Sequence, residues 1–123
     1  MSQYDLLIVN QKPPYSSSTA NEALDLALAA GAFDQKVAIL FLEDGVYQLL
    51  GEQAPDALNQ KSLEKMLGAA GFYGVDLLAA ESASLYKRGI HPEKHLNSSI
   101  QVECLSEKAV AKLYQDSKTI IRF

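Results

Sequence analysis

Cys104 carries the single thiol of the chain and is its strongest candidate nucleophile. A reactive thiol needs a lowered pKa, which a histidine, a nearby cation or a helix N-terminus can provide. Cys104 instead follows Ile100 and Val102 at alternate positions of a predicted strand. This spacing predicts that Cys104 is a small buried side chain. The alternative is a persulfide carrier that uses Cys104 and acts alone.

His91 and His95 are four residues apart, the spacing that places two side chains on one face of a helix. Pro92 and the polar residues around it predict a loop there instead. The neighbouring sequence offers no third ligand of the kind that a zinc site requires. We therefore expect no metal site.

The loop from Asn10 to Ser18 follows the first predicted strand, where many α/β proteins bind nucleotides. It contains no glycine, so it matches neither the dinucleotide fingerprint nor the P-loop. We expect no cofactor. A flavodoxin-like binder, which would hold a flavin or nucleotide through serines and backbone amides, is an alternative.

The stretch from Glu43 to Leu50 places two acids, a glycine, a tyrosine and an amide directly after the most apolar predicted strand. The carboxyl ends of central strands are where α/β folds place their functional groups. A binding surface and a turn that packs its tyrosine and leucines on the sheet fit these residues equally well.

The elements that must position these residues alternate between strand and helix. Apolar runs and period-two patterns predict strands over residues 6–9, 36–42, 75–80, 100–104 and 119–123. Helical spacing predicts helices over residues 19–31, 58–70, 82–87 and 107–115, with a helical turn over 46–50 and Gly31 ending the first helix. This order predicts one domain over residues 1–123, an α/β/α three-layer sandwich with a five-stranded, mostly parallel sheet.

The charge balance limits the classes of partner. The chain has 11 basic and 15 acidic residues, a net charge of −4, and a pI near 5.1. That excess of acid disfavours direct binding to nucleic acid. No apolar run approaches the length of a membrane span, the first ten residues do not resemble a signal peptide, and one cysteine is typical of a reducing compartment. We expect a cytoplasmic protein that does not bind membranes.

The segment Phe41–Leu49, FLEDGVYQL, resembles the second-strand signature of the TusC/DsrF family. Four other features agree with it in order and spacing, so the resemblance covers essentially the whole chain. They are Pro14-Tyr15-Ser16 with a helix start at Glu22–Asp25, the run Ala32-Phe33-Asp34-Gln35, the helix end Ser84-Leu85-x-x-Arg88-Gly89, and the final Arg122-Phe123.

The resemblance implies a DsrE/DsrF-like fold and a subunit of a sulfur-relay complex. Such a complex combines three related chains in a dimer of heterotrimers, so the implied partners are TusB-like and TusD-like subunits. The Tus version moves persulfide sulfur toward 2-thiolation of the tRNA wobble uridine, and the Dsr version serves sulfur oxidation. The short chain, which lacks an acidic insertion in its second half, favours the Tus version. A homo-oligomer is the alternative when the chain is expressed alone.

The resemblance also implies where function lies. The sulfur-accepting cysteine of the TusD/DsrE subunit begins the helix that ends in Arg-Gly, and counting back from Arg88-Gly89 places Glu81 there. A carboxylate cannot carry a persulfide, so the resemblance implies a non-catalytic subunit. We expect the partner interface to include Asp44, Gly45, Tyr47, Gln48 and Glu81. Four tyrosines on predicted loops or element ends are further candidates for contact, namely Tyr15, Tyr47, Tyr73 and Tyr86.

Overall fold

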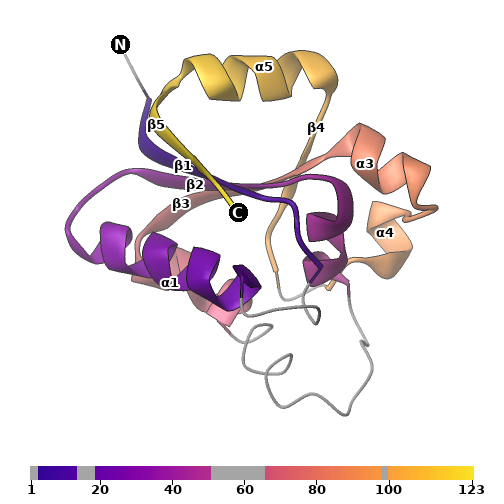
Figure 1. Ribbon diagram of the computed structural model, residues 1–123. Coiled ribbons are helices and arrows are strands. Elements are labelled where there is room, and N and C mark those ends of the chain that lie inside the picture. Colours follow the sequence, from indigo (N-terminus) through magenta and orange to yellow (C-terminus); the bar gives the residue numbers. More distant parts are fainter. Residues whose placement is uncertain (1–2, 14–18, 51–65, 98–99) are drawn as a thin grey trace.

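Five parallel strands form one sheet in the order β4-β3-β2-β1-β5 (Figure 1). The computed structural model describes residues 3–13, 19–50, 66–97 and 100–123, with side chains described from residue 22 in the second range. The strands are β1 (Tyr4–Asn10), β2 (Val37–Phe41), β3 (Val75–Glu81), β4 (Glu103–Leu105) and β5 (Ser117–Arg122). The predicted five-stranded parallel sheet is therefore confirmed.

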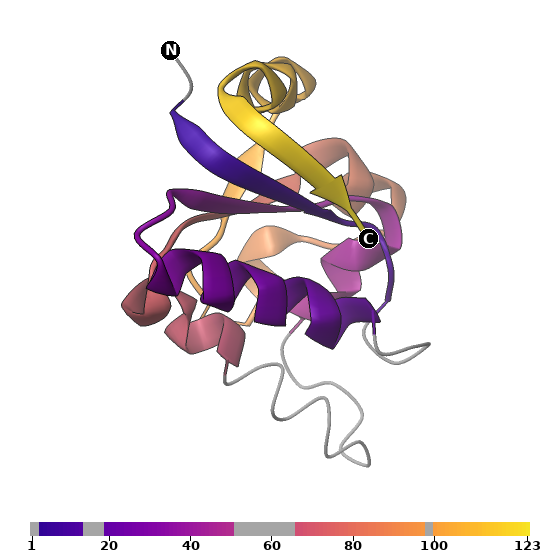
Figure 2. The same ribbon diagram turned by 60° about the vertical axis from the view of Figure 1, so that its left-hand side comes forward.

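Helices cover both faces of this sheet. The α-helices are α1 (Thr19–Ala32), α3 (Ser82–Lys87), α4 (Pro92–His95) and α5 (Glu107–Gln115), and the 3₁₀ helices are η1 (Glu43–Leu49) and η2 (Ala70–Tyr73). Residues 66–69 are helical and lead into η2. Figures 1 and 2 show α1 and η2 below the sheet, α5 above it, and α3 beside one end. This arrangement confirms the three-layer prediction.

The core has two halves, one on each face of the sheet. Along β1, Leu6 and Ile8 pack into the half that contains α1, whereas Leu7 and Val9 pack into the half that contains Leu113 of α5. Every residue of β2 is buried. Because β1 and β2 are buried on both faces, their sequences are continuous apolar runs instead of alternating apolar and polar residues.

Gly31 was predicted to end the first helix, and that prediction is wrong because α1 continues to Ala32. A Cβ atom on Gly31 would lie 2.7 Å from the carbonyl oxygen of Tyr73. The glycine is therefore required by the close approach of α1 to η2. Gly74 ends η2 with a φ of 95°, a left-handed conformation that favours glycine.

The structure corrects two further expectations in the second half of the chain. The predicted loop over residues 90–99 contains the short helix α4, which begins with Pro92 at a position that favours proline. The imidazole Nδ1 of His95 accepts a hydrogen bond from the backbone N–H of His91 at 2.9 Å and closes this turn. The fourth strand begins at Glu103 instead of residue 100. Residues 58–65 of the predicted second helix lie outside the described residues.

The helices that the structure describes include none long and apolar enough to cross a membrane.

Candidate functional site

The carboxyl ends of β2 and β3 bring η1 and α3 together, and Ser84 links them (Figure 1). The hydroxyl of Ser84 accepts a hydrogen bond from the backbone N–H of Glu43 at 2.8 Å and donates one to Oε1 of Glu81 at 2.6 Å. Ser84 itself is buried. We call the group Glu43, Asp44, Glu81, Ser84 and Arg88 the η1–α3 cluster.

Asp44 and Arg88 join the same two elements at the surface. Oδ1 of Asp44 accepts hydrogen bonds from Nε of Arg88 at 3.1 Å and from Nη2 at 3.0 Å. Nη1 of Arg88 donates to the carbonyl oxygen of Ser84 at 3.2 Å, which fixes the guanidinium over the end of α3. The Asp44 side chain stays 55% exposed. The pair therefore orients an accessible carboxylate and contributes little to folding.

Gln48 anchors η1 to the end of β1 and to Lys12, which follows that strand. Its Nε2 donates to Oδ1 of Asn10 at 2.8 Å and to the carbonyl oxygen of Lys12 at 2.9 Å, and its Oε1 accepts from Nδ2 of Asn10 at 3.3 Å. Both amide side chains are buried. Their mutual hydrogen bonds remove the cost of burying two polar groups.

Gly45 lies where η1 packs directly against the backbone at the end of β1. A Cβ atom there would lie 1.9 Å from the carbonyl oxygen of Asn10, so no side chain fits. Glu43 begins η1 with a φ of 49°, a left-handed conformation that costs an ordinary residue about 1–2 kcal/mol. The hydrogen bond from its N–H to Ser84 helps to hold this turn.

The five predicted interface residues therefore divide into two groups. Asp44 is exposed, and Tyr47 and Glu81 are half-buried, so these three reach the surface at the carboxyl end of the sheet. Gly45 and Gln48 are buried and act as supports of η1. The sequence reasoning did not assign a role to Ser84, Arg88 or Asn10. The spacing of Glu81, Ser84 and Arg88 on one helical face could have indicated two of them.

Among the candidate contact tyrosines, two are strongly exposed: Tyr73 at 60% and Tyr86 at 86%. Tyr47 is half-buried. Tyr15 lies outside the described residues.

Cys104 is exposed, so the prediction of a buried thiol is wrong. The period-two pattern failed because Ile100 and Val102 precede the three-residue edge strand β4 and pack into or against the core, whereas Cys104 lies within β4 and belongs to neither half of the core. Partial burial nevertheless raises the pKa of the Cys104 thiol. The structure thus provides an accessible thiol without the lowered pKa that sulfur chemistry requires.

His91 and His95 are both exposed, with ring centroids 5.6 Å apart. In the part of the chain that the structure describes, no three His, Cys, Asp or Glu residues are grouped so that they could hold a metal ion.

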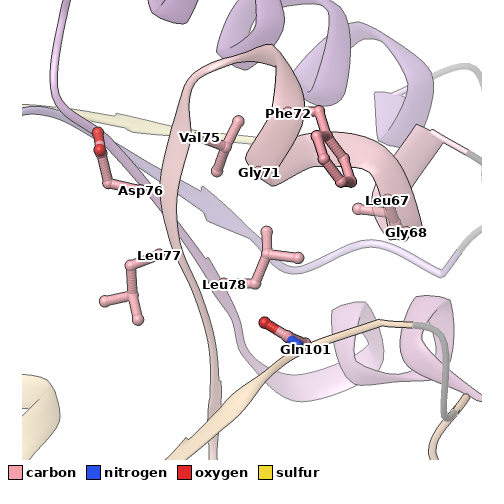
Figure 3. Close-up of a pocket in the computed structure, with 9 residues that line it drawn as sticks. All are labelled: Leu67, Gly68, Gly71, Phe72, Val75, Asp76, Leu77, Leu78 and Gln101. Carbon is pink, nitrogen blue, oxygen red and sulfur yellow. The ribbon is translucent and has the colours of Figure 1, made fainter.

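A hollow of about 500 Å³ lies beside the amino-terminal half of β3, at the other end of that strand from Glu81 (Figure 3). Its lining is Leu67, Gly68, Gly71, Phe72, Val75, Asp76, Leu77, Leu78 and Gln101. Oδ2 of Asp76 already accepts a hydrogen bond from the backbone N–H of Val37 at 2.9 Å. The described residues of this lining, about half of whose surface is polar, include neither a nucleophile nor a set of metal ligands, so we place the candidate site at the η1–α3 cluster.

Comparisons with known proteins agree with the resemblance seen in the signature. The family model described as DsrE/DsrF-like matches residues 5–123. A Pseudomonas aeruginosa protein named TusC homolog is 43% identical over 121 residues, covering 98% of each chain. The intracellular sulfur oxidation protein DsrF of Allochromatium vinosum is 30% identical and covers 95% of this chain and 94% of its own. Escherichia coli protein TusC is 29% identical over 89% of this chain and 91% of its own.

The fold has a counterpart among solved structures. The crystal structure of the ychN protein from Escherichia coli matches with a TM-score of 0.76 at 20% identity, over 100% of both chains.

Proposed function

The chain belongs to the DsrE/DsrF-like family, and we propose that it is a non-catalytic subunit of a cytoplasmic sulfur-relay complex. The observation that carries this proposal is the similarity to the TusC homolog of Pseudomonas aeruginosa, 43% identical over 98% of each chain. We further propose that the complex supports 2-thiolation of the tRNA wobble uridine. The relative named for sulfur oxidation, DsrF, and Escherichia coli TusC are equally distant, at 30% and 29%, so our preference for the Tus version over the Dsr version rests on the 43% match to the TusC homolog.

The non-catalytic part of the proposal is supported by the chemistry at two positions. Glu81, which the count back from Arg88-Gly89 places at the position of a sulfur-accepting cysteine, accepts a hydrogen bond from Ser84 and carries no nucleophilic sulfur. Cys104 has a raised pKa, whereas a sulfur carrier needs thiolate at neutral pH. The chain then contributes surface to the complex, and a partner subunit provides the reactive cysteine.

The interface that we propose lies at the η1–α3 cluster. Asp44 and Glu81 present carboxylates there, and Tyr47 adds an aromatic ring between them in sequence. Gly45 and Gln48 hold η1 in place from inside. The partners that we propose are a TusB-like and a TusD-like subunit in a dimer of heterotrimers.

Deletion of the gene in its native cells tests the pathway. We expect loss of 2-thiouridine from the tRNAs that carry it, measured by mass spectrometry of digested tRNA. Complementation with the intact chain and with Cys104→Ser should restore the nucleoside equally. Unchanged 2-thiouridine in the deletion strain would contradict the tRNA role, and failure of Cys104→Ser alone would favour the Cys104 carrier.

A further inference from the structure

β5 forms one edge of the sheet (Figure 2). Its only neighbour in the sheet is β1, and no other described strand lies outside it. Of its six residues, Ser117 is buried and the other five are exposed. The register with β1 runs without a bulge, and β5 contains no proline. It therefore lacks two of the devices that commonly stop an edge strand from pairing with another chain.

The backbone of β5 offers hydrogen-bonding groups to such a partner. Phe123, which follows β5, donates its N–H to Val9 at 2.8 Å, and its carbonyl accepts from the N–H of Gln11 at 3.3 Å. Successive residues of a strand direct these groups to opposite sides, so the odd-numbered residues bond to β1. The N–H and C=O groups of Lys118, Ile120 and Arg122 consequently point to the open edge.

The side chains define the charge of that edge. Ile120 is 39% exposed and lies on the α5 side of the sheet, because it pairs in register with Leu7, whose side chain faces that side. Ile121 is 36% exposed and lies on the opposite side. Alternation places Lys118 and Arg122 on the same face as Ile120, one before it and one after it. The Arg122 guanidinium lies 5.4 Å from the ring centroid of Tyr114. β5 contains no acidic residue.

We propose that the open edge of β5 pairs with an extended segment of a different protein chain that carries a carboxylate on each side of an aliphatic residue. Main-chain hydrogen bonds to Lys118, Ile120 and Arg122 would extend the sheet by one strand. Opposite charges on directly facing strands stabilise the pair, and like charges destabilise it. A second copy of β5 would bring two more cations and no carboxylate, so the same residues disfavour self-pairing.

This surface is separate from the η1–α3 cluster and does not depend on the proposed function. It rests on the strand order, the exposure of β5 and its charges alone.

The test uses the purified chain and a synthetic peptide, acetyl-Thr-Glu-Val-Ile-Val-Glu-Thr-amide, whose glutamates match the spacing of Lys118 and Arg122. In the free protein, we expect fast amide hydrogen exchange at Lys118, Ile120 and Arg122 and slow exchange at Thr119 and Ile121. At saturating peptide, exchange at the first three should slow by about tenfold or more. A control peptide with lysines in place of the glutamates should bind at least about tenfold more weakly, because both cross-strand charge pairs become repulsive.

The paired variant Lys118→Glu with Arg122→Glu separates charge recognition from misfolding. It should lose affinity for the glutamate peptide and gain affinity for the lysine peptide, while Lys87→Glu on α3 leaves both unchanged. Three results would overturn the proposal: no saturable binding, binding without slowed exchange at the three outward amides, or self-association of the free chain that the paired variant abolishes.

Discussion

Gln48 and Asn10 exchange two amide hydrogen bonds, at 2.8 Å and 3.3 Å, across 38 positions of sequence. Gln48 is 1% exposed and Asn10 is 2% exposed, so water cannot replace either bond. The pair connects η1 to the end of β1 and thereby sets the position of Asp44 and Tyr47 at the surface. The position of the candidate interface residues on η1 therefore depends on this buried hydrogen-bonded pair.

Replacing Gln48 by alanine should lower the free energy of unfolding by about 2–4 kcal/mol. The substitution leaves the Asn10 amide and the Lys12 carbonyl without their partner and opens a cavity. Urea unfolding measures the change. Gln115→Ala, at an exposed position of α5, is the control and should shift stability by no more than about 0.5 kcal/mol. Equal values for the two variants would contradict the role of the buried amide pair.

Gly45→Ala should prevent stable folding or cost more than about 3 kcal/mol, since its Cβ would overlap the Asn10 carbonyl at 1.9 Å. Gly71→Ala is the matched control, because nothing lies within 4 Å of a Cβ there and φ is not positive. That variant should be neutral or stabilising by up to about 1 kcal/mol. Thermal unfolding followed by circular dichroism distinguishes the two variants. A Gly45→Ala variant as stable as the parent chain would contradict the close approach of Gly45 to the Asn10 carbonyl.

Ser84→Ala should destabilise the fold by about 1–3 kcal/mol. The substitution removes the hydroxyl that accepts from the Glu43 N–H and donates to the Glu81 carboxylate. Because Ser84 is buried, water does not readily take the place of that hydroxyl. Asp44→Asn, which weakens a partly exposed ion pair, should cost less than about 1 kcal/mol. Chemical denaturation of both variants tests this ranking, and the reverse order would contradict the assignment of Ser84 as the link between η1 and α3.

Cys104 should be fully alkylated without denaturant, because it is exposed, but slowly at neutral pH. Burial raises its pKa, so less of the reactive thiolate is present at any given pH than in an unperturbed thiol. The pH at which alkylation reaches half its maximal rate should lie above that of N-acetylcysteine amide measured in parallel. A midpoint well below that reference would support the Cys104 carrier instead.

The sheet was predictable because its signals are local. The apolar run of β2 and the alternation of strands with helices can be recognised without knowing which distant residues are in contact. These two patterns were enough to predict a five-stranded, mostly parallel sheet. The helix α5 was predicted at its observed bounds, and Ser106 accounts for its start by accepting a hydrogen bond from the N–H of Ala109 at 3.2 Å.

The details that depend on contacts between distant segments were not predictable. Gly31 was predicted to end a helix because glycine commonly does so. The actual reason for a glycine there is the carbonyl of Tyr73, which excludes a side chain and lies more than forty residues later in the sequence. Cys104 looked buried because the alternation of apolar residues does not indicate where the core ends along an edge strand. Asp44 was identified through the signature, and Glu81 by counting back from Arg88-Gly89. The hydrogen bonds that join Arg88 to Asp44 and Ser84 to Glu81 were not predicted, because they link segments that are distant in the sequence or depend on the start of α3.

Native mass spectrometry of the tagged chain, purified from its native cells, tests the central claim most directly. The sulfur-relay proposal predicts a complex of the chain with two different small subunits, one bearing a reactive cysteine. Asp44→Arg should release both subunits while Asp25→Arg, at an exposed position of α1, retains them. A chain that is found alone or only with copies of itself would contradict the proposal.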